Sequence, residues 1–208
     1  VENENTIILD TSTAHRTEAG WAYGYPELSA AHREAIRTGK RIAVPGCYAT
    51  GFITTAYALT AGGILPKDYP VSAFAVSGYS GGGKKMIAQY QAQDKEKELS
   101  SARLYALSQS HKHLKEMKAI SGLERTPLFS PMVTDYYSGM TVSLTFYADM
   151  LNGRQTPETV REYLAKHYAG EKFITVQPLG AEAESGGVLF SSARSGWDGL
   201  EIYVTGNE

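Results

Sequence analysis

Blocks of apolar and polar positions divide the first third of the chain into short strands and helices. Residues 6–10 are apolar and rich in β-branched side chains, which predicts a buried strand of a parallel sheet. Residues 26–38 are predicted to form a helix, with Gly39 at its C-cap. The next predicted strand covers residues 42–44, and a helix is predicted to follow over residues 47–61 because apolar side chains recur there at helical spacing.

The rest of the chain carries the same two periodicities. Residues 71–76 are predicted to form a strand, and a glycine-rich turn separates them from a short helix. Apolar and mostly polar side chains alternate over residues 140–147, the pattern of a half-buried strand. Thr156 as N-cap and Pro157 as first helical residue predict a helix that Gly170 ends. The remaining predicted strands cover residues 173–176, 188–191 and 200–204.

This order of elements predicts an α+β fold. A mixed, largely antiparallel sheet with helices on one side is the simplest way to bury both kinds of apolar pattern. The 208 residues are enough for one large domain or two small ones. A dinucleotide fingerprint of the Gly-x-Gly-x-x-Gly type would follow a first strand, whereas the one dense glycine cluster, residues 77–84, stands in mid-chain. By itself this cluster is a weak signal for a phosphate-binding loop.

Composition excludes several classes of function. A net charge of -2 gives no basic surface for nucleic acid. The longest apolar runs are far too short to span a bilayer. The single cysteine cannot form an intrachain disulfide, which favours a reducing compartment. We therefore expect a cytoplasmic protein that binds neither nucleic acid nor membrane.

Cys47 is the sharpest candidate for chemistry. It follows a predicted strand and a Pro-Gly turn, and it stands where a helix is predicted to begin. Unpaired backbone N–H groups and the positive end of the helix dipole favour a thiolate there, and the thiolate is the reactive form of a nucleophilic cysteine. The alternative is a small buried apolar residue, the usual setting of a lone cysteine.

The five histidines are the candidates for an acid–base partner of that cysteine. His111 and His113 form the only closely spaced pair, in a polar stretch that is not part of an apolar stripe. His32 and His167 fall at helical spacing among apolar neighbours, which favours core or helix-end positions. His15 lies in a polar loop. No further ligands stand at zinc-site spacing from the histidine pair and the cysteine, so no metal site is expected.

Two segments have the chemistry to bind anionic groups. Arg16 follows the first predicted strand, at the strand end where α/β sheets bind ligands, and its guanidinium suits a carboxylate. Residues 80–83 would let a ligand approach the backbone closely and would present N–H groups to an oxyanion or a phosphate. The alternatives are an ordinary surface arginine and a plain turn between a strand and a helix.

Five ordered motifs resemble those of the N-acetyl-γ-glutamyl-phosphate reductases, in particular the shorter type of that family. Val44-Pro-Gly-Cys-Tyr-Ala-Thr-Gly51 is similar to the family's active-site signature. The family's amino-terminal nucleotide-binding segment and its carboxy-terminal segment have no counterpart here, so we expect an excised portion. The other four motifs are residues 10–16 (Asp-Thr-Ser-Thr-Ala-His-Arg), residues 21–28 (Trp-Ala-Tyr-Gly-Tyr-Pro-Glu-Leu), residues 77–84, and Tyr105 with residues 111–116 (His-Lys-His-Leu-Lys-Glu).

The resemblance implies reduction of N-acetyl-glutamyl phosphate to its semialdehyde with NADP(H), through a thioester on Cys47. It implies that His111 is the main acid–base group, with His113 as second choice, and that the protein is a homo-oligomer, either a dimer or a tetramer. Residues 1–46 would be a remnant of the nucleotide-binding domain with its connection, and residues 47–208 a substrate-binding catalytic and dimerisation domain. The implied substrate contacts are Ser12, Arg16, Tyr105 and Glu116, and the implied cofactor contacts are Ser80, Gly81 and Gly82.

Other functions remain open from the residues alone. A sister reductase could act on a glutamyl or aminoadipyl group carried by a protein, although an acidic carrier would want a basic rim that this chain lacks. Aspartate-semialdehyde or glyceraldehyde-phosphate dehydrogenases share the thioester chemistry but space their motifs differently. A cofactor-independent Cys–His hydrolase and a non-enzymatic assembly domain are the remaining alternatives.

Overall fold

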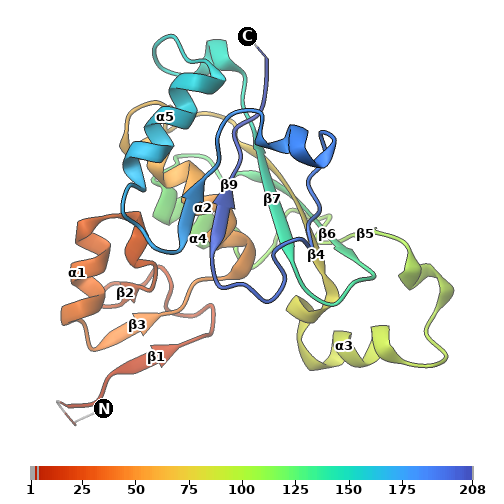
Figure 1. Cartoon of the computed structure of the whole chain (residues 1–208). Helices are drawn as coiled ribbons and strands as arrows, with labels where there is room; N and C mark the ends of the chain where they lie inside the picture. The colour runs from red at the N-terminus through yellow and green to blue at the C-terminus, as the bar shows by residue number, and fades with distance from the viewer. Residues whose placement is uncertain (1–2, 4, 208) are drawn as a thin grey trace.

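The computed structural model describes residue 3 and residues 5–207, and its first part is a small parallel sheet (Figure 1). Strands β1 (Ile8–Asp10) and β2 (Ala22–Tyr23) both pair in parallel with the central β3 (Arg41–Ala43). The helices η1 (Pro26–Leu28) and α1 (Ala30–Thr38) connect β2 to β3. Only residues 44–46 separate the end of β3 from Cys47, so this short connection fixes where the next helix begins.

The larger sheet has the strand order β5-β6-β4-β7. Its central strands β4 (Ser72–Gly78) and β6 (Leu128–Thr134) are parallel, while β5 (Arg103–Leu104) and β7 (Met140–Thr145) run antiparallel to their neighbours. Together with the helices that pack on it, this mixed sheet confirms the predicted α+β class.

Helix α2 (Cys47–Ala61) lies at the centre of the molecule. Its side chains are apolar around almost the whole circumference, which is the pattern of a fully buried helix. It packs against β7 and against α4 (Leu114–Ser121). Gly51 permits the close approach to β7, since a Cβ there would lie 2.7 Å from Cγ2 of Val142. The buried side chains of α2 are Tyr48, Ala49, Phe52, Ile53, Thr54, Ala56, Ala58 and Leu59.

Three peripheral pieces complete the fold. Helix α5 (Pro157–His167) begins with the predicted Thr156 cap, which accepts a hydrogen bond from the Thr159 amide. Strands β8 (Ile174–Val176) and β9 (Leu200–Ile202) form a separate two-stranded parallel sheet near α5. Helix α3 (Gly83–Gln91) and the short helices η2 (Tyr79–Gly82) and η3 (Lys97–Ser100) form a lobe beside the large sheet (Figure 1). The remaining short helices are η4 (Ala148–Met150) and η5 (Ala181–Ser185).

Several sequence predictions were wrong in detail. Residues 26–38 are two helices because Ser29 is extended (φ -168°, ψ 165°) and caps α1 by accepting the amide of His32. Residues 188–191 form no strand; they follow left-handed glycines at 186 and 187 and are largely exposed. The first strand is not buried, since Leu9 at the sheet edge is 65% exposed.

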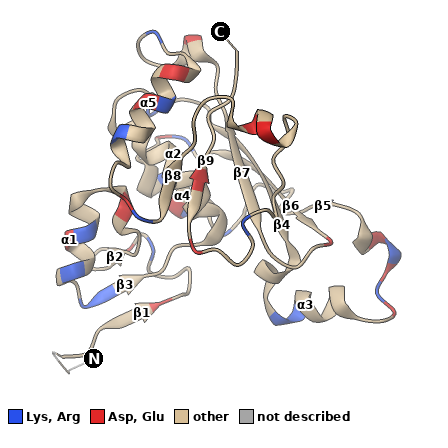
Figure 2. Cartoon of the chain, in the orientation of Figure 1, with Lys and Arg blue, Asp and Glu red and all other residues tan. Residues whose placement is uncertain are grey.

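Charge is distributed unevenly over these elements. Lysine, arginine, aspartate and glutamate residues occur on α1, α3, α5 and the connecting segments, whereas α2, β4, β6 and β7 contain none (Figure 2). Among the described residues, none of the helices combines the length and apolar content needed to cross a membrane. Helix α2 and strands β4, β6 and β7 are therefore an uncharged centre with a charged periphery.

Candidate active site

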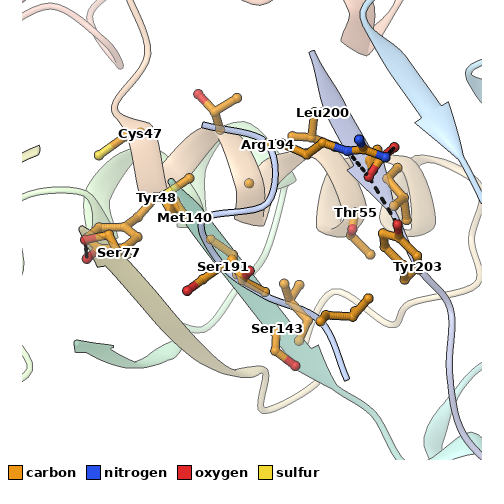
Figure 3. Close-up of a pocket in the computed structure, with 18 of the residues that line it drawn as sticks. Cys47, Tyr48, Thr55, Ser77, Met140, Ser143, Ser191, Arg194, Leu200 and Tyr203 are labelled. Atoms are coloured by element: carbon orange, nitrogen blue, oxygen red, sulfur yellow. Dashed lines mark hydrogen bonds and ion pairs between the residues drawn. The ribbon is translucent and has the colours of Figure 1, made fainter. Parts of the chain in front are cut away.

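Cys47 is the first residue of α2 and lines a cavity of about 1770 Å³. Gly46 is the N-cap in extended conformation and supplies no side-chain cap, so the start of the helix is open toward the cavity. Figure 3 shows the cavity running along α2, with Cys47, Tyr48 and Ser77 at one end and Arg194 and Tyr203 at the other.

This cavity brings together most of the residues that the sequence predicted. Ser12 and Glu116 lie outside its lining: Ser12 is on the exposed loop after β1, and Glu116 is buried behind the cavity wall. The predicted residues that line it are Arg16, Cys47, Ser80, Gly81, Gly82, Tyr105, His111 and His113.

Cys47 is solvent-exposed, but protein atoms around its thiol remove much of the water that would hydrate it. Loss of hydration raises the pKa of this thiol, while the backbone N–H of Tyr48 and the positive charge of Lys112 oppose the rise. The helix start therefore favours the thiolate as predicted, but the desolvation outweighs it. At neutral pH the free thiol is the major form, and a base or the bound substrate has to promote its deprotonation.

His111 is held in one ring orientation. Its Nδ1 accepts the backbone N–H of His113 at 3.2 Å, and its Nε2 faces the hydroxyl of Tyr105 at 3.4 Å. Because a backbone amide can only donate, the neutral ring carries its proton on Nε2. Partial burial, with a smaller contribution from Lys112, lowers the pKa of His111, so the neutral ring presents an Nε2–H donor to the cavity.

His113 lies deeper than His111 and is only 3% exposed. Burial lowers its pKa to about 3, with contributions from the neighbouring charges of His111, Arg16 and Lys112. Its Nδ1 has no hydrogen-bond partner among the described residues. A Cβ at Gly46 would collide with the ring of His113, so only glycine fits before Cys47. His113 thus supports the start of α2 as a neutral ring.

A buried ion pair lies behind the cysteine. Arg16 Nη1 donates to Glu116 Oε1 at 2.6 Å, and both side chains are buried. Oε2 of the same carboxylate accepts the hydroxyl of Tyr23 at 3.0 Å and the amide of Gly46 at 3.2 Å. Arg16 also donates to the carbonyls of Val44 and Thr11. The predicted carboxylate clamp therefore binds a carboxylate of its own chain.

Tyr48 was missed as a site residue. Its hydroxyl lies 2.6 Å from Ser77 Oγ and donates to the carbonyl of Met132 at 3.2 Å, which fixes the ring beneath Cys47. The same ring packs edge-on against His111 and His113. Its position next to the cysteine in the signature motif was the one signal that could have found it.

The glycine loop is partly a structural turn. The amides of Gly78, Tyr79 and Ser80 donate to carbonyls of residues 136–139, and a Cβ at Gly78 would lie 2.6 Å from two of the carbonyl oxygens in that stretch. Gly81 has open space around it, and Gly82 is the N-cap of α3 and supplies no side-chain cap. Ser80, Gly81 and Gly82 line the cavity, whereas the amide of Gly83, the first residue of α3, donates to the carbonyl of Ser80.

The loop after β1 holds its own polar cluster. Ser12 Oγ donates to Asp10 at 2.8 Å, and His15 pairs with the same carboxylate while its ring stacks on Trp21. His15 is the main cause that lowers the pKa of Asp10 to about 2, followed by Ser12. No group of three or more His, Cys, Asp or Glu side chains suited to a metal ion occurs in the described part of the chain.

Similar proteins include several reductases. The chain is 41% identical over 207 residues to the N-acetyl-gamma-glutamyl-phosphate reductase of Rhizobium meliloti (strain 1021), a match that covers 99% of this chain and 66% of that protein. The protein of that name from Sinorhizobium fredii (strain NBRC 101917 / NGR234) is 41% identical over 205 residues, covering 98% and 66%. The chain therefore spans slightly less than two thirds of the length of these relatives.

Solved structures show the same fold at low identity. Aspartate semialdehyde dehydrogenase from Francisella tularensis superposes with a TM-score of 0.66 at 13% identity, over 95% of this chain and 64% of the other. Aspartate semialdehyde dehydrogenase II from Vibrio cholerae gives 0.65 at 14%, over 95% and 61%. The family profile described as "Semialdehyde dehydrogenase, dimerisation domain" matches residues 47–193. The chain belongs to the semialdehyde dehydrogenase family, carries its dimerisation domain, and is a homologue of the N-acetyl-gamma-glutamyl-phosphate reductases.

Proposed function

We propose that this chain is the substrate-binding and catalytic portion of an NADPH-dependent N-acetyl-γ-glutamyl-phosphate reductase. The observation that carries the proposal is the shared cavity of Cys47 and His111 at the start of α2, in a chain 41% identical to enzymes of that name. Residues 1–46 would belong to the nucleotide-binding domain and its connection, and residues 47–208 would form the catalytic and dimerisation domain.

The first chemical step is acyl transfer to sulfur. The Cys47 thiolate attacks the γ-acyl carbon of N-acetyl-glutamyl phosphate and expels phosphate, which leaves a thioester. In this proposal the Nε2–H of His111, which faces the Tyr105 hydroxyl at 3.4 Å, donates to the oxyanion of this step. A preorganised donor of this kind is worth about 3 kcal/mol of transition-state stabilisation. The open start of α2 provides backbone amides for the same purpose.

Reduction releases the product from Cys47. NADPH, when bound, supplies the hydride that the thioester carbon accepts. The Nε2–H of His111 donates a hydrogen bond to the oxygen that becomes negative. When that oxygen re-forms the carbonyl of the semialdehyde, the sulfur leaves as the Cys47 thiolate. Ser80, Gly81 and Gly82 would hold part of the cofactor, since they line the same cavity and Gly81 leaves open space for a phosphate group to approach the backbone.

Residues around His111 would bind the polar ends of the substrate. Tyr105 presents its hydroxyl beside His111, and Arg16 lines the cavity while it is braced by Glu116. We assign Tyr105 and Arg16 to the α-carboxylate and acetyl end. Glu116 acts through Arg16, because its carboxylate is 2% exposed and already accepts three hydrogen bonds. Ser12 lies outside the cavity lining, and its hydroxyl, which donates to Asp10, would contact the substrate from the loop after β1.

A homo-oligomer would form through the outer face of the large sheet. Phe74 and Leu128 are 43% and 60% exposed on β4 and β6, whose alternate residues are buried, and Leu104 on β5 is 51% exposed. Apart from Arg103 in β5, the four strands of the sheet carry no charged residue, and residues 47–193 match a dimerisation domain. A second copy of this chain is therefore the proposed occupant of this face.

Intact-mass analysis after mixing the chain with N-acetyl-glutamyl phosphate, without cofactor, tests the proposal. An acyl adduct that is absent from Cys47→Ala is the expected result. An adduct with β-aspartyl phosphate but none with the N-acetyl-glutamyl compound would reassign the substrate. For the complete protein, NADP-dependent and phosphate-dependent oxidation of the semialdehyde is expected, whereas ester hydrolysis without cofactor would identify a Cys–His hydrolase.

A further inference from the structure

The segment that delivers His111 to the cavity has an unusual backbone. Ala106 and Gln109 both have positive φ, 53° and 55°, in the left-handed region that side chains other than glycine rarely adopt. Such conformations persist where surrounding contacts enforce them, and they concentrate at functional sites. The contacts that enforce this one come from strand β6.

Gln109 replaces a strand residue with its side chain. The pairing of β5 with β6 places Leu104 opposite Met132, and the amide of Tyr105 still donates to the carbonyl of Pro131. Continued pairing would bring the next backbone amide and carbonyl to Phe129. Instead the chain turns away at Ala106, and the carboxamide of Gln109 takes that place: Nε2 donates to the Phe129 carbonyl at 3.0 Å, and Oε1 accepts the Phe129 amide at 2.9 Å.

Phe129 is also the residue against which His111 rests. Its ring is 1% exposed and lies edge-on to His111, with centroids 5.2 Å apart, and to Tyr48 at 5.4 Å. Gln109 therefore ties the loop to the backbone of the residue that seats the histidine two positions further on. The ring can then receive the His113 amide at Nδ1 and keep its proton on Nε2.

We infer that Gln109 is a positioning residue, whose bidentate bond to the Phe129 backbone fixes the ring orientation and the tautomer of His111. The inference rests on the proposed function for the catalytic importance of His111. The ring orientation and the tautomer of His111 are properties of the folded chain, so they can be tested without measuring turnover.

The test is ¹⁵N NMR of the histidine side chains in the full chain, with the His111 signals assigned from His111→Gln. In the native protein His111 should show one widely separated pair of signals, with the proton on Nε2. In Gln109→Ala the pair should move together as the two tautomers exchange, and the pKa of His111 should rise toward its usual value. Ser108→Ala is the matched control, because Ser108 lies in the same loop and bonds only to Ser110 among the described contacts.

A second variant keeps the test usable if Gln109→Ala does not fold. Gln109→Glu keeps the acceptor for the Phe129 amide but loses the donor to its carbonyl, and it should shift the same signals if Gln109→Ala unfolds. Native tautomer and pKa in a folded Gln109→Ala would overturn the inference, and so would unfolding of both variants, which would make the role purely structural. Failure of the acyl-adduct experiment with a native His111 signal would instead contradict the proposed function and leave this inference standing.

Discussion

The reactivity of Cys47 depends on opposing effects at one sulfur atom. Desolvation raises the thiol pKa, and the Lys112 charge is one of the effects that lower it. Alkylation by iodoacetamide should therefore show a pH midpoint above that of a free thiol. Lys112→Ala should slow alkylation at pH 8 about two-fold, the size of effect expected for one exposed charge. Lys115→Ala is the control, since Lys115 pairs with Glu18; an equal slowing would rule out a specific effect of Lys112.

His113 should make the protein sensitive to acid. Its pKa is about 3 in the folded chain and near the usual 6.5 in the unfolded chain, so the unfolded state binds the proton first. Its contribution to stability is complete above pH 6.5 and is lost as the pH falls toward 3, by up to about 1.4 kcal/mol per pH unit. Urea unfolding from pH 7 to pH 4 should show a steeper loss for the native protein than for His113→Gln. Parallel curves would contradict this account.

At the residue scale, the sequence identified the reacting groups better than their supports. Cys47 and His111 were predicted from local features, a helix start and a polar histidine pair, and the structure places both in one cavity. The partner of Arg16 could not be predicted, because Glu116 is 100 positions away and no local pattern encodes that contact. Tyr23, 93 positions from Glu116, was hidden for the same reason.

The packing of α2 on β7 depends on the missing side chain at Gly51. Gly51→Ala gains helix propensity, about 1 kcal/mol, but places a Cβ 2.7 Å from Cγ2 of Val142. Overpacking of a stiff β-branched side chain costs about 1–3 kcal/mol, so we expect a net loss of about 1 kcal/mol. The double variant Gly51→Ala/Val142→Ala should show a favourable coupling energy in urea unfolding. Additive effects would mean that the helix shifts to avoid the clash.

The Arg16–Glu116 pair joins the loop after β1 to α4 and to the start of α2. Glu116→Gln would leave the buried guanidinium without its counter-charge, which should cost about 3 kcal/mol of unfolding free energy. Glu34→Gln makes the same substitution in the exposed Arg37–Glu34 pair and should lower the unfolding free energy far less, because solvent screens that pair. Similar losses for the two variants, measured by urea unfolding, would show that the buried pair contributes no more than a surface pair.

At the element scale, strong local signals gave accurate boundaries. The structure has α2 over the predicted residues 47–61, and α5 begins at Pro157 after its Thr156 cap. Strand β6 escaped prediction because Pro131 interrupts it, and proline usually argues against a central strand. It is tolerated here because the Pro131 carbonyl faces β5, where it accepts the amide of Tyr105. The N–H that proline lacks would face the same side, and the pairing with β5 ends there, so the strand pairing loses little.

At the scale of the whole molecule, periodicity shows that a strand has two faces but not what covers each face. The first strand was expected to be buried, yet Leu9 within it is 65% exposed and Ile7 just before it is 58% exposed. The same limit applies to the large sheet, where α2 covers one face and the described chain leaves apolar side chains on the other. Which partner covers an exposed face depends on other polypeptide segments, which the pattern of one strand does not encode.

The last prediction concerns association of two copies through the outer face of the large sheet. If two copies pair through it, a buried carboxylate in its middle should prevent association, because desolvating an unpaired charge is costly. Phe74 suits this test, since its register partners Ser130 and Ser143 place it centrally on β4. We expect sedimentation equilibrium to give a dimer or tetramer for the native chain and a monomer for Phe74→Asp. Leu107→Asp adds the same charge at a more exposed leucine outside the sheet and should leave the oligomer intact. If Phe74→Asp remains as associated as the Leu107 variant, the interface lies elsewhere.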